Sequence, residues 1–264
     1  MKKGNASYRA RGFLSRVKEA SKEKGIRYVA LAGVNRMRRM VIDSFWCYYY
    51  SLFKSWSTFT FQGKNYKYFY HRYNTTWRNE RAVEIPIIWH IVKTCEWRSV
   101  LEVGNVLSHY FTVNHDIVDK YEKAEGVISQ DVTEIRPSKK YDLIISISTL
   151  EHVGWDENPG DHRILHESKK ITYTIDVLKR LLTSKGEIVV TLPLGYNPYL
   201  DKLLKSGEIK FDDRFYLKRI SKDNRWIEVS WKDVERLKYN GLIPSANGLI
   251  IGVIKSENKI KPAP

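Results

Sequence analysis

Polar residues that could bind a ligand or move a proton follow four apolar segments between residues 100 and 152. Glu102 and Gly104 lie at the end of the first segment, Asp119 follows the second, Asp131 the third and His152 the fourth. A carboxylate accepts hydrogen bonds from hydroxyl and amino groups, and a histidine can act as a general base near neutral pH. These residue types at these places are typical of a ligand-binding site.

The apolar segments are predicted to be strands of one sheet, because each is short and almost continuously apolar. Helices are predicted over residues 77–93 and 164–182, so strands and helices alternate. This alternation predicts an α/β fold with a Rossmann-like, doubly wound, mostly parallel seven-stranded sheet. The expected strands cover residues 100–103, 116–118, 126–128, 141–146, 186–192, 225–231 and 249–254. In such a sheet the ligand lies beyond the carboxyl ends of the strands, where the polar residues are found.

Five stretches from Val100 onward resemble the core of the class I S-adenosylmethionine-dependent methyltransferases. They are VLEVGN, HDIVDKYE, SQDVTEI, YDLIISISTLEHVG and KGEIVVTLPLG, and they follow one another in the order found in that family. The fourth stretch resembles the fourth-strand motif of the small-molecule O- and C-methyltransferases, and we expect an enzyme of the small-molecule or sugar O-methyltransferase type. The resemblance implies a Rossmann-like fold, S-adenosylmethionine (SAM) as cofactor, and methyl transfer as the reaction.

The resemblance also implies which residues bind the adenosine part of the cofactor. Asp119 would accept hydrogen bonds from both ribose hydroxyls, as acids at this place do in dinucleotide-binding folds. Asp131 would accept one from the adenine amino group, with the backbone amide of Val132 beside a ring nitrogen. Either aspartate could instead cap a helix, which is the commoner use of an isolated aspartate.

The methionine part of the cofactor would lie at the first motif. Gly104 would let the backbone approach it without a β-carbon, while Glu102 and the backbone of Ser146 would hold its ammonium group. The family usually carries further glycines here; in this chain Gly104 is followed by Asn105, which tolerates positive φ better than most residues. Glu102 could instead be a buried acid paired with Arg98 or with a backbone amide.

The methyl acceptor would approach beside the fourth strand, where His152 could remove the proton of a hydroxyl group. His152 could equally cap or pack a helix. Glu80 and Glu151 are interpreted as solvated acids or acids at a helix start. The acids and histidines of residues 151–166 match no metal-ligand spacing, so no metal is expected. The candidate substrate-binding residues are Trp77, Arg81, Trp155, Tyr196 and Asn197.

Basic residues are concentrated at the start of the chain. Residues 1–72 contain 16 Lys and Arg against 3 Asp and Glu, whereas residues 73–264 contain 29 against 27. The same region is aromatic, with 14 Phe, Trp and Tyr between residues 45 and 73. We predict a loose segment over residues 1–25, a helix over 27–53, and a β-hairpin with strands 58–61 and 66–70. Residues 1–72 therefore fit contact with an anionic membrane surface.

This contrast predicts an N-terminal extension over residues 1–73, a methyltransferase domain over 74–257 and a tail over 258–264. Cys47 and Cys95 are too few for a disulfide framework and fit a reducing compartment. The N-terminus lacks the apolar core of a signal peptide, and the uncharged residues 44–53 are too few to span a membrane. We therefore expect a cytoplasmic protein that is peripheral at the inner face of a membrane.

Three kinds of function are compatible with these features. The first is O-methylation of a sugar in a surface glycan or its lipid-linked precursor, with a small hydroxylated acceptor. The second is methylation of RNA or protein, with the basic segment as a binding arm. Nucleic acid is disfavoured because residues 73–264 carry little basic excess and lack an Asn/Asp-Pro-Pro-Tyr motif. The third is a non-catalytic scaffold, suggested by the reduced glycine motif.

Overall fold

The computed structural model describes residues 26–94, 99–135, 139–155, 164–241 and 244–256. The predicted loose segment 1–25 and the tail 258–264 lie outside these residues. The chain divides into two compact units, residues 1–50 and residues 51–264. In the first unit the described structure is helix α2 (Ile26–Phe53), which continues into the second unit and is close to the helix expected over 27–53.

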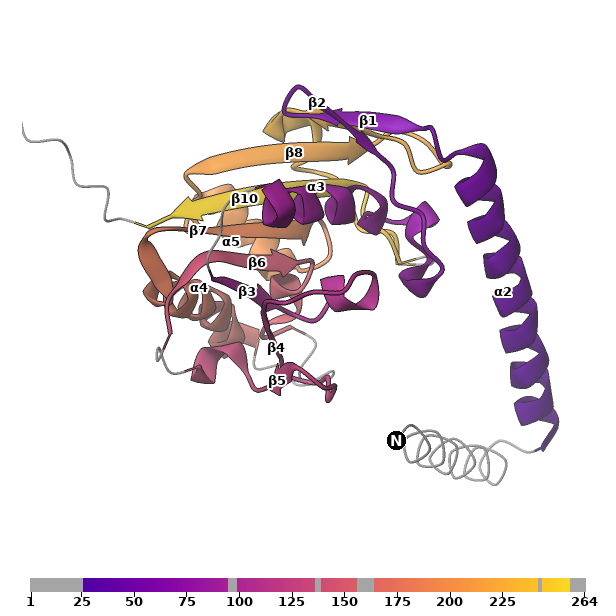
Figure 1. The fold of residues 1–264 in the computed structure, drawn as a ribbon, viewed down its shortest axis with the longest axis horizontal. Coiled ribbons are helices and arrows are strands. Elements are labelled where there is room, and N and C mark those ends of the chain that lie inside the picture. The colour runs from indigo at the N-terminus through magenta and orange to yellow at the C-terminus, as the bar shows by residue number, and fades with distance from the viewer. Residues whose placement is uncertain (1–25, 95–98, 136–138, 156–163, 242–243, 257–264) are drawn as a thin grey trace, which may run out of the picture. The chain divides into compact units, whose positions relative to one another are not determined.

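The second unit is built on an eight-stranded sheet with the order β5-β4-β3-β6-β7-β10-β8-β9 (Figure 1). The five strands from β5 to β7 pair in parallel, and β10, β8 and β9 pair antiparallel. Their bounds are β3 (Val100–Val103), β4 (Asp116–Asp119), β5 (Val127–Ser129), β6 (Tyr141–Ile147), β7 (Leu182–Pro193), β8 (Asp213–Arg219), β9 (Trp226–Val229) and β10 (Gly248–Lys255). The expected Rossmann-like, mostly parallel sheet is confirmed.

The sheet has one strand more than the seven expected, because the sequence shows no apolar run at β8. This strand reads DRFYLKR, and only Leu217 within it is fully buried. Four of its seven residues are charged, so its side chains lack the hydrophobic pattern by which the other strands were recognised. Its pairing with β10 on one side and β9 on the other defines it instead.

Helices cover both faces of the sheet (Figure 1). Apolar residues of α4 (Ile164–Arg180) and α5 (Pro198–Ser206) pack on one face, in one core with Ile144 of β6. Helix α3 (Arg81–Thr94) packs on the other face, in a second core with Leu143 and Ile145. Neighbouring residues of β6 thus point to opposite cores, as the alternation along a strand requires.

The hairpin consists of β1 (Thr58–Phe61) and β2 (Lys64–Lys67), with Gln62 and Gly63 as its turn. Both turn residues have positive φ, 51° and 69°, which suits a two-residue hairpin turn and shortens the loop expected over 62–65. Phe59 and Phe61 are buried in the core on the α3 face of the sheet. The hairpin thus lies in the compact unit 51–264, whereas we assigned it to the N-terminal extension.

Helix α3 begins at Arg81, four residues after the expected start at Trp77. The preceding residues form the 3-10 helix η1 (Tyr73–Arg78), where Asn74 and Thr75 have φ values of 56° and 46°. The side chain of Asn79 then accepts a hydrogen bond from the Arg81 amide at 3.1 Å, which marks the true start of α3. No helix among the described residues is long and apolar enough to cross a membrane.

Candidate functional site

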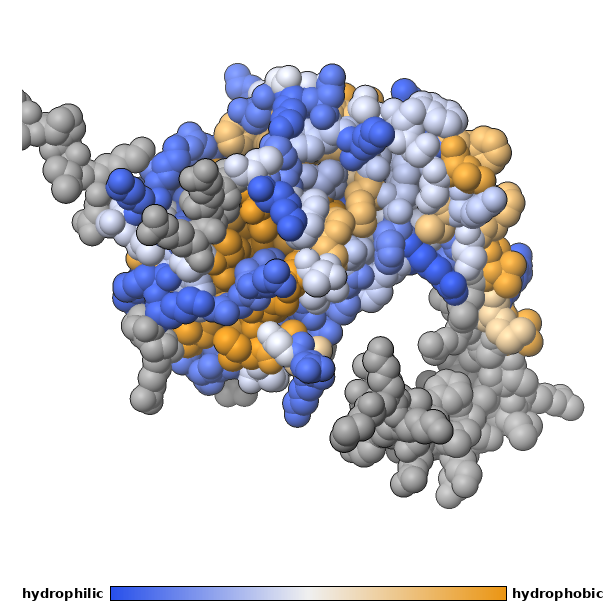
Figure 2. Space-filling view, viewed as in Figure 1, coloured by the Kyte–Doolittle hydropathy of each residue, from blue (hydrophilic) through white to orange (hydrophobic). Residues whose placement is uncertain are grey.

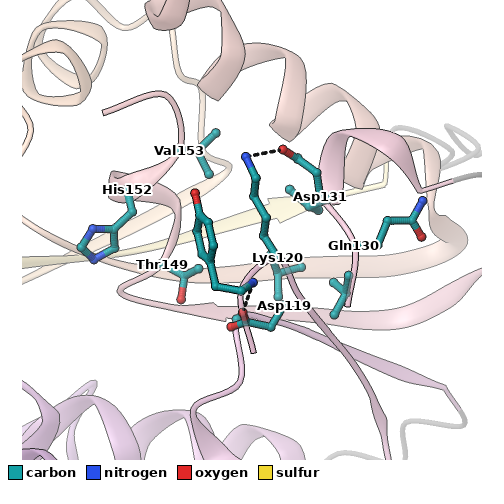
Figure 3. A pocket seen from close by; sticks show the side chains of 12 residues that line it. Asp119, Lys120, Gln130, Asp131, Thr149, His152 and Val153 are labelled. Carbon is teal, nitrogen blue, oxygen red and sulfur yellow. Dashed lines mark hydrogen bonds and ion pairs between the residues drawn. The ribbon is translucent and has the colours of Figure 1, made fainter. Parts of the chain in front are cut away.

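A cavity of about 380 Å³ lies at the carboxyl ends of β3, β4, β5 and β6 (Figure 3). Because these strands are parallel neighbours, the residues that follow them occur along the edge in the order of the strands. The cavity is lined by Val103, Gly104, Val118, Asp119, Lys120, Tyr121, Gln130, Asp131, Val132, Thr149, His152 and Val153. The structure therefore brings together Gly104, Asp119, Asp131, Val132 and His152 from the sequence-predicted set.

Gly104 has a backbone conformation that other residues rarely adopt, with φ at 85°. Its amide donates to the carbonyl of Val118 at 2.8 Å, so this turn is tied to β4. A β-carbon here would lie 2.3 Å from Oγ1 of Thr149. Asn105 is absent from the described residues with positive φ, so our suggestion that it replaces a glycine in that conformation is wrong. It is buried and lies outside the cavity lining.

The carboxylate of Asp119 organises the two loops that frame the cavity. Its Oδ1 accepts the amides of Tyr121 and Glu122, each at 2.8 Å, and its Oδ2 accepts the amide of Asn105 at 3.0 Å. A carboxylate offers about four acceptor positions, so these three bonds leave room for one more donor. Asp119 thus has both a loop-binding role and a remaining acceptor position at the cavity.

Asp131 has more hydrogen-bond and ion-pair partners than Asp119. Its Oδ1 accepts the amide and hydroxyl of Thr133, while Lys120 and Lys170 lie 3.0 and 3.2 Å from its Oδ2 (Figure 3 shows the Lys120 pair). Burial opposes ionisation, but these hydrogen bonds outweigh it and hold the pKa of Asp131 well below its usual value. Asp131 also caps the 3-10 helix η3 (Val132–Glu134), the alternative we left open. All of its acceptor positions are in use.

Glu102 lies fully buried and away from the cavity lining. Its Oε1 accepts the amides of Val106 and Leu107 at 2.9 and 2.8 Å, and Nε2 of His115 lies 2.8 Å from its Oε2. Of the two alternatives to cofactor binding, the pairing with backbone amides is the one observed; Arg98 lies outside the described residues. Ser146 is also buried, and its hydroxyl donates to the carbonyl of Val103 at 3.2 Å.

His152 lies at the end of the cavity nearest β6, and its side chain is 46% exposed. Its Nδ1 is 3.2 Å from the hydroxyl of Tyr196, and the two rings meet edge to face. The ring of Tyr196 in turn contacts that of Tyr239, with ring centroids 4.9 Å apart. Tyr196 is therefore the substrate-binding candidate that the structure places directly against His152.

The other residues that we predicted to bind the methyl acceptor contact groups of the protein itself. Asn197 is buried, accepts two backbone amides at the start of α5, and donates to the carbonyl of Glu151 at 2.8 Å. Trp155 is half-buried and packs beside Tyr199 at 6.1 Å between ring centroids. Trp77 is buried in the turn before α3. None of these residues lines the cavity.

Arg81 is part of a buried network that braces the end of β6. Its guanidinium donates to Glu84 at 3.0 Å and to the carbonyls of Ile147 and Ser148 at 2.9 and 3.4 Å. Glu84 also accepts the hydroxyls of Ser148 and Thr191. Ser148 has φ at 38°, an uncommon value for a serine, so the network holds a strained backbone in place. Arg81 therefore positions the segment that leads to Thr149 and His152.

Two further acids at this end of the sheet, Glu80 and Glu151, are buried, so the interpretation that they are solvated is wrong. The other interpretation, an acid at a helix start, holds for Glu151, which lies in the first turn of the 3-10 helix η4 (Leu150–His152). Glu151 is 2% exposed, and its Oε2 has no hydrogen-bond partner among the described residues. Burial raises its pKa well above the usual value, although the charge of Arg81 opposes this shift. Glu80 accepts the amide of Ala246 at 2.8 Å, and burial followed by the nearby Glu84 raises its pKa.

Sequence reasoning missed several residues of this region. Lys120, Tyr121, Gln130 and Thr149 line the cavity, and each is adjacent in sequence to a residue that we did select or follows a predicted strand. That adjacency was the available signal. Among the described residues no group of three or more His, Cys, Asp or Glu could hold a metal ion.

Comparisons with known proteins give distant structural likenesses. No protein-family profile and no curated protein matches the chain. The chain is similar to N-methyltransferase NodS from Bradyrhizobium japonicum WM9 in complex with S-adenosyl-L-homocysteine, at 11% identity, a TM-score of 0.44, and coverage of 69% of this chain and 92% of that one. It is also similar to a 1,6-didemethyltoxoflavin-N1-methyltransferase from Burkholderia thailandensis, at 12% identity, a TM-score of 0.37, and coverage of 64% and 75%. Likenesses at this level say nothing of the substrate.

The burial of Glu151 gives a prediction about stability and pH. Because its pKa is raised in the folded state, the folded protein keeps the proton when the unfolded chain loses it. The free energy of unfolding should therefore fall as pH rises above about 4.5, the usual value for glutamate. Glu151→Gln, which mimics the protonated acid, should reduce this fall. Urea unfolding followed by circular dichroism between pH 4 and 8 measures it.

The matched control is Glu125→Gln, because Glu125 is an exposed acid. This variant should keep the pH dependence of the wild type. The free energy of unfolding of Glu151→Gln should still fall somewhat as pH rises, since the pKa of Glu80 is raised as well. An unchanged pH dependence in Glu151→Gln would show that Glu151 ionises in the folded protein.

Proposed function

We propose that this chain is a class I SAM-dependent methyltransferase that transfers a methyl group to a hydroxyl of a small acceptor. One observation supports this most: Asp131, Asp119, Gly104 and His152 follow β5, β4, β3 and β6, which are neighbours in that order, and all four line one cavity. A SAM molecule lying along this edge would have its adenine at Asp131 and its ribose at Asp119. Its methionine part would lie at Gly104, and the methyl group to be transferred would lie toward His152.

The residues present fit such a cofactor at two points. Asp119 keeps an acceptor position for a ribose hydroxyl after binding three amides. Gly104 lines the cavity and has no side chain, so its backbone could lie against a ligand as the resemblance implies. When bound, SAM would supply a methyl group activated by a positively charged sulfur. Glu102 would act by fixing the loop after β3, because its oxygens already bind that loop.

We place the acceptor at the His152 end of the cavity, and its class is a sugar of a surface glycan or of a lipid-linked precursor. His152 would accept the hydroxyl proton as the methyl group arrives. Its contact with Tyr196 supports this role, because a ring nitrogen held by a hydroxyl has a defined orientation. Tyr196 and Tyr239 offer aromatic surfaces beside it for a sugar ring.

One observation favours the alternative of a non-catalytic scaffold. All acceptor positions of Asp131 are used by Thr133, Lys120 and Lys170, so an adenine amino group must displace one of them. Displacing a partly exposed lysine is inexpensive, because such ion pairs contribute about 0–1 kcal/mol. We therefore favour the enzyme, and a direct measurement of SAM binding separates the two functions.

Asp119→Ala should weaken SAM binding at least about tenfold, since it removes a hydrogen bond between a ribose hydroxyl and a charged acceptor and also the amide bonds that hold the two cavity loops. Isothermal titration calorimetry with the full chain measures the affinity. Glu122→Gln is the matched control, because Glu122 lies in the same loop and outside the cavity lining. Thermal unfolding should verify that both variants fold. No detectable binding by the wild type would favour the scaffold.

Lys120→Met should tighten SAM binding about threefold, because it frees an acceptor position on Asp131 at the cost of one partly exposed ion pair. The comparison is Lys123→Met, which alters an exposed lysine of the same loop that does not line the cavity. The control should bind as the wild type does. Weaker binding by Lys120→Met would instead assign Lys120 a direct contact with the ligand.

His152→Ala should leave SAM affinity nearly unchanged and lower turnover by about a hundredfold or more, the usual contribution of a general base. Turnover is measured as transfer of labelled methyl groups from SAM to glycan and lipid-linked fractions of a strain that lacks this protein. His90→Ala, outside the cavity, is the control. Turnover retained by His152→Ala would make His152 a structural residue.

A further inference from the structure

A row of large apolar side chains is exposed along α2 (Figure 2 shows apolar side chains over this helix). The members of the row are Val34, Met37, Val41, Phe45, Tyr48 and Leu52, which are 47–69% exposed. They follow one another at intervals of three or four residues, so they lie on one side of the helix. We call these residues the α2 row.

Aromatic side chains widen the α2 row toward the end of the helix. Trp46 is 43% exposed, and its ring contacts those of Phe45 and Tyr49 at 5.7 and 5.6 Å between centroids. Rings that combine an apolar body with a polar edge are favoured where a membrane meets water. A group of exposed apolar and aromatic side chains along one helix is typical of an interaction surface.

The charge around the α2 row indicates the chemistry of its partner. Arginines occur in the helix at positions 27, 36, 38 and 39, and its one acid is Asp43. The larger segment 1–72 has 16 basic and 3 acidic residues. A partner of α2 must therefore accept apolar side chains and attract positive charge.

We propose that α2 lies on the surface of an anionic lipid bilayer, with the α2 row inserted at the level of the headgroups. A helix that exposes aromatic and aliphatic side chains and also carries several arginines suits this position. The negative surface potential of such a membrane attracts basic residues. A second copy of the chain is a poorer partner, because it would bring two strongly basic segments together. This proposal does not depend on the proposed methyl transfer.

Flotation of the full chain with vesicles tests the proposal. The vesicles contain phosphatidylcholine and phosphatidylserine in one set and phosphatidylcholine alone in the other. The wild type should float with the anionic vesicles, and high salt should release it. Phe45→Ser with Leu52→Ser should reduce the bound fraction at least tenfold, because both members of the α2 row lose their apolar contact with lipid.

The control is Tyr173→Ser with Ile220→Ser, which removes two exposed apolar side chains elsewhere on the surface. It should float as the wild type does, and both double variants should keep the wild-type melting temperature. Three results would overturn the proposal: no flotation of the wild type, equal binding to neutral vesicles, or undiminished binding by the Phe45 and Leu52 variant. A dimer of the wild type in sedimentation that this variant abolishes would likewise assign the α2 row to a second copy.

Discussion

The buried carboxylate of Glu84 is the interaction on which the end of the sheet depends. It is completely buried, and a charge in that position is tolerated when it is paired and hydrogen-bonded. Arg81 supplies the pair, while Ser148 and Thr191 supply hydroxyl donors from the ends of β6 and β7. Helix α3 is thereby joined to both strands at one point. The same contacts hold the positive φ of Ser148 and so place Thr149 against Gly104.

The acids at the strand ends follow the same physical rule. Glu102 binds two amides of the loop after β3, Asp119 binds amides on both sides of the cavity, and Asp131 caps η3 while pairing with two lysines. Asp119 and Asp131 therefore help to build the cavity wall, and Glu102 holds the loop after β3, before any ligand is considered. A strand end is a place where backbone amides lose their sheet partners, so a carboxylate there satisfies them. Binding a ligand uses whatever acceptor positions remain.

Much of the fold could be predicted from the sequence, because β3, β6, β10 and residues 188–193 of β7 are mostly apolar and their burial follows from that composition. Strand β8 could not be predicted, because most of its side chains are charged and only its pairing with β10 and β9 defines it as a strand. The positions of Gly104, Asp119 and Asp131 could be predicted from their places after strands. The burial of Glu80 could not, because its partner Ala246 is 166 residues away and acids are usually exposed.

Three buried acids lie near one arginine at the acceptor end of the proposed site, and burial opposes the ionisation of two of them. Glu84 pairs directly with Arg81, while the pKa values of Glu80 and Glu151 are raised by burial. Under the proposed function this has a consequence for the reaction. Methyl transfer removes the positive charge of the sulfonium, so a carboxylate beside it would stabilise the starting state more than the transition state. Glu151 lies beside His152, with its Oε1 3.7 Å from Nε2 of the histidine, and its raised pKa favours the neutral acid, so less negative charge lies at the acceptor end of the proposed site.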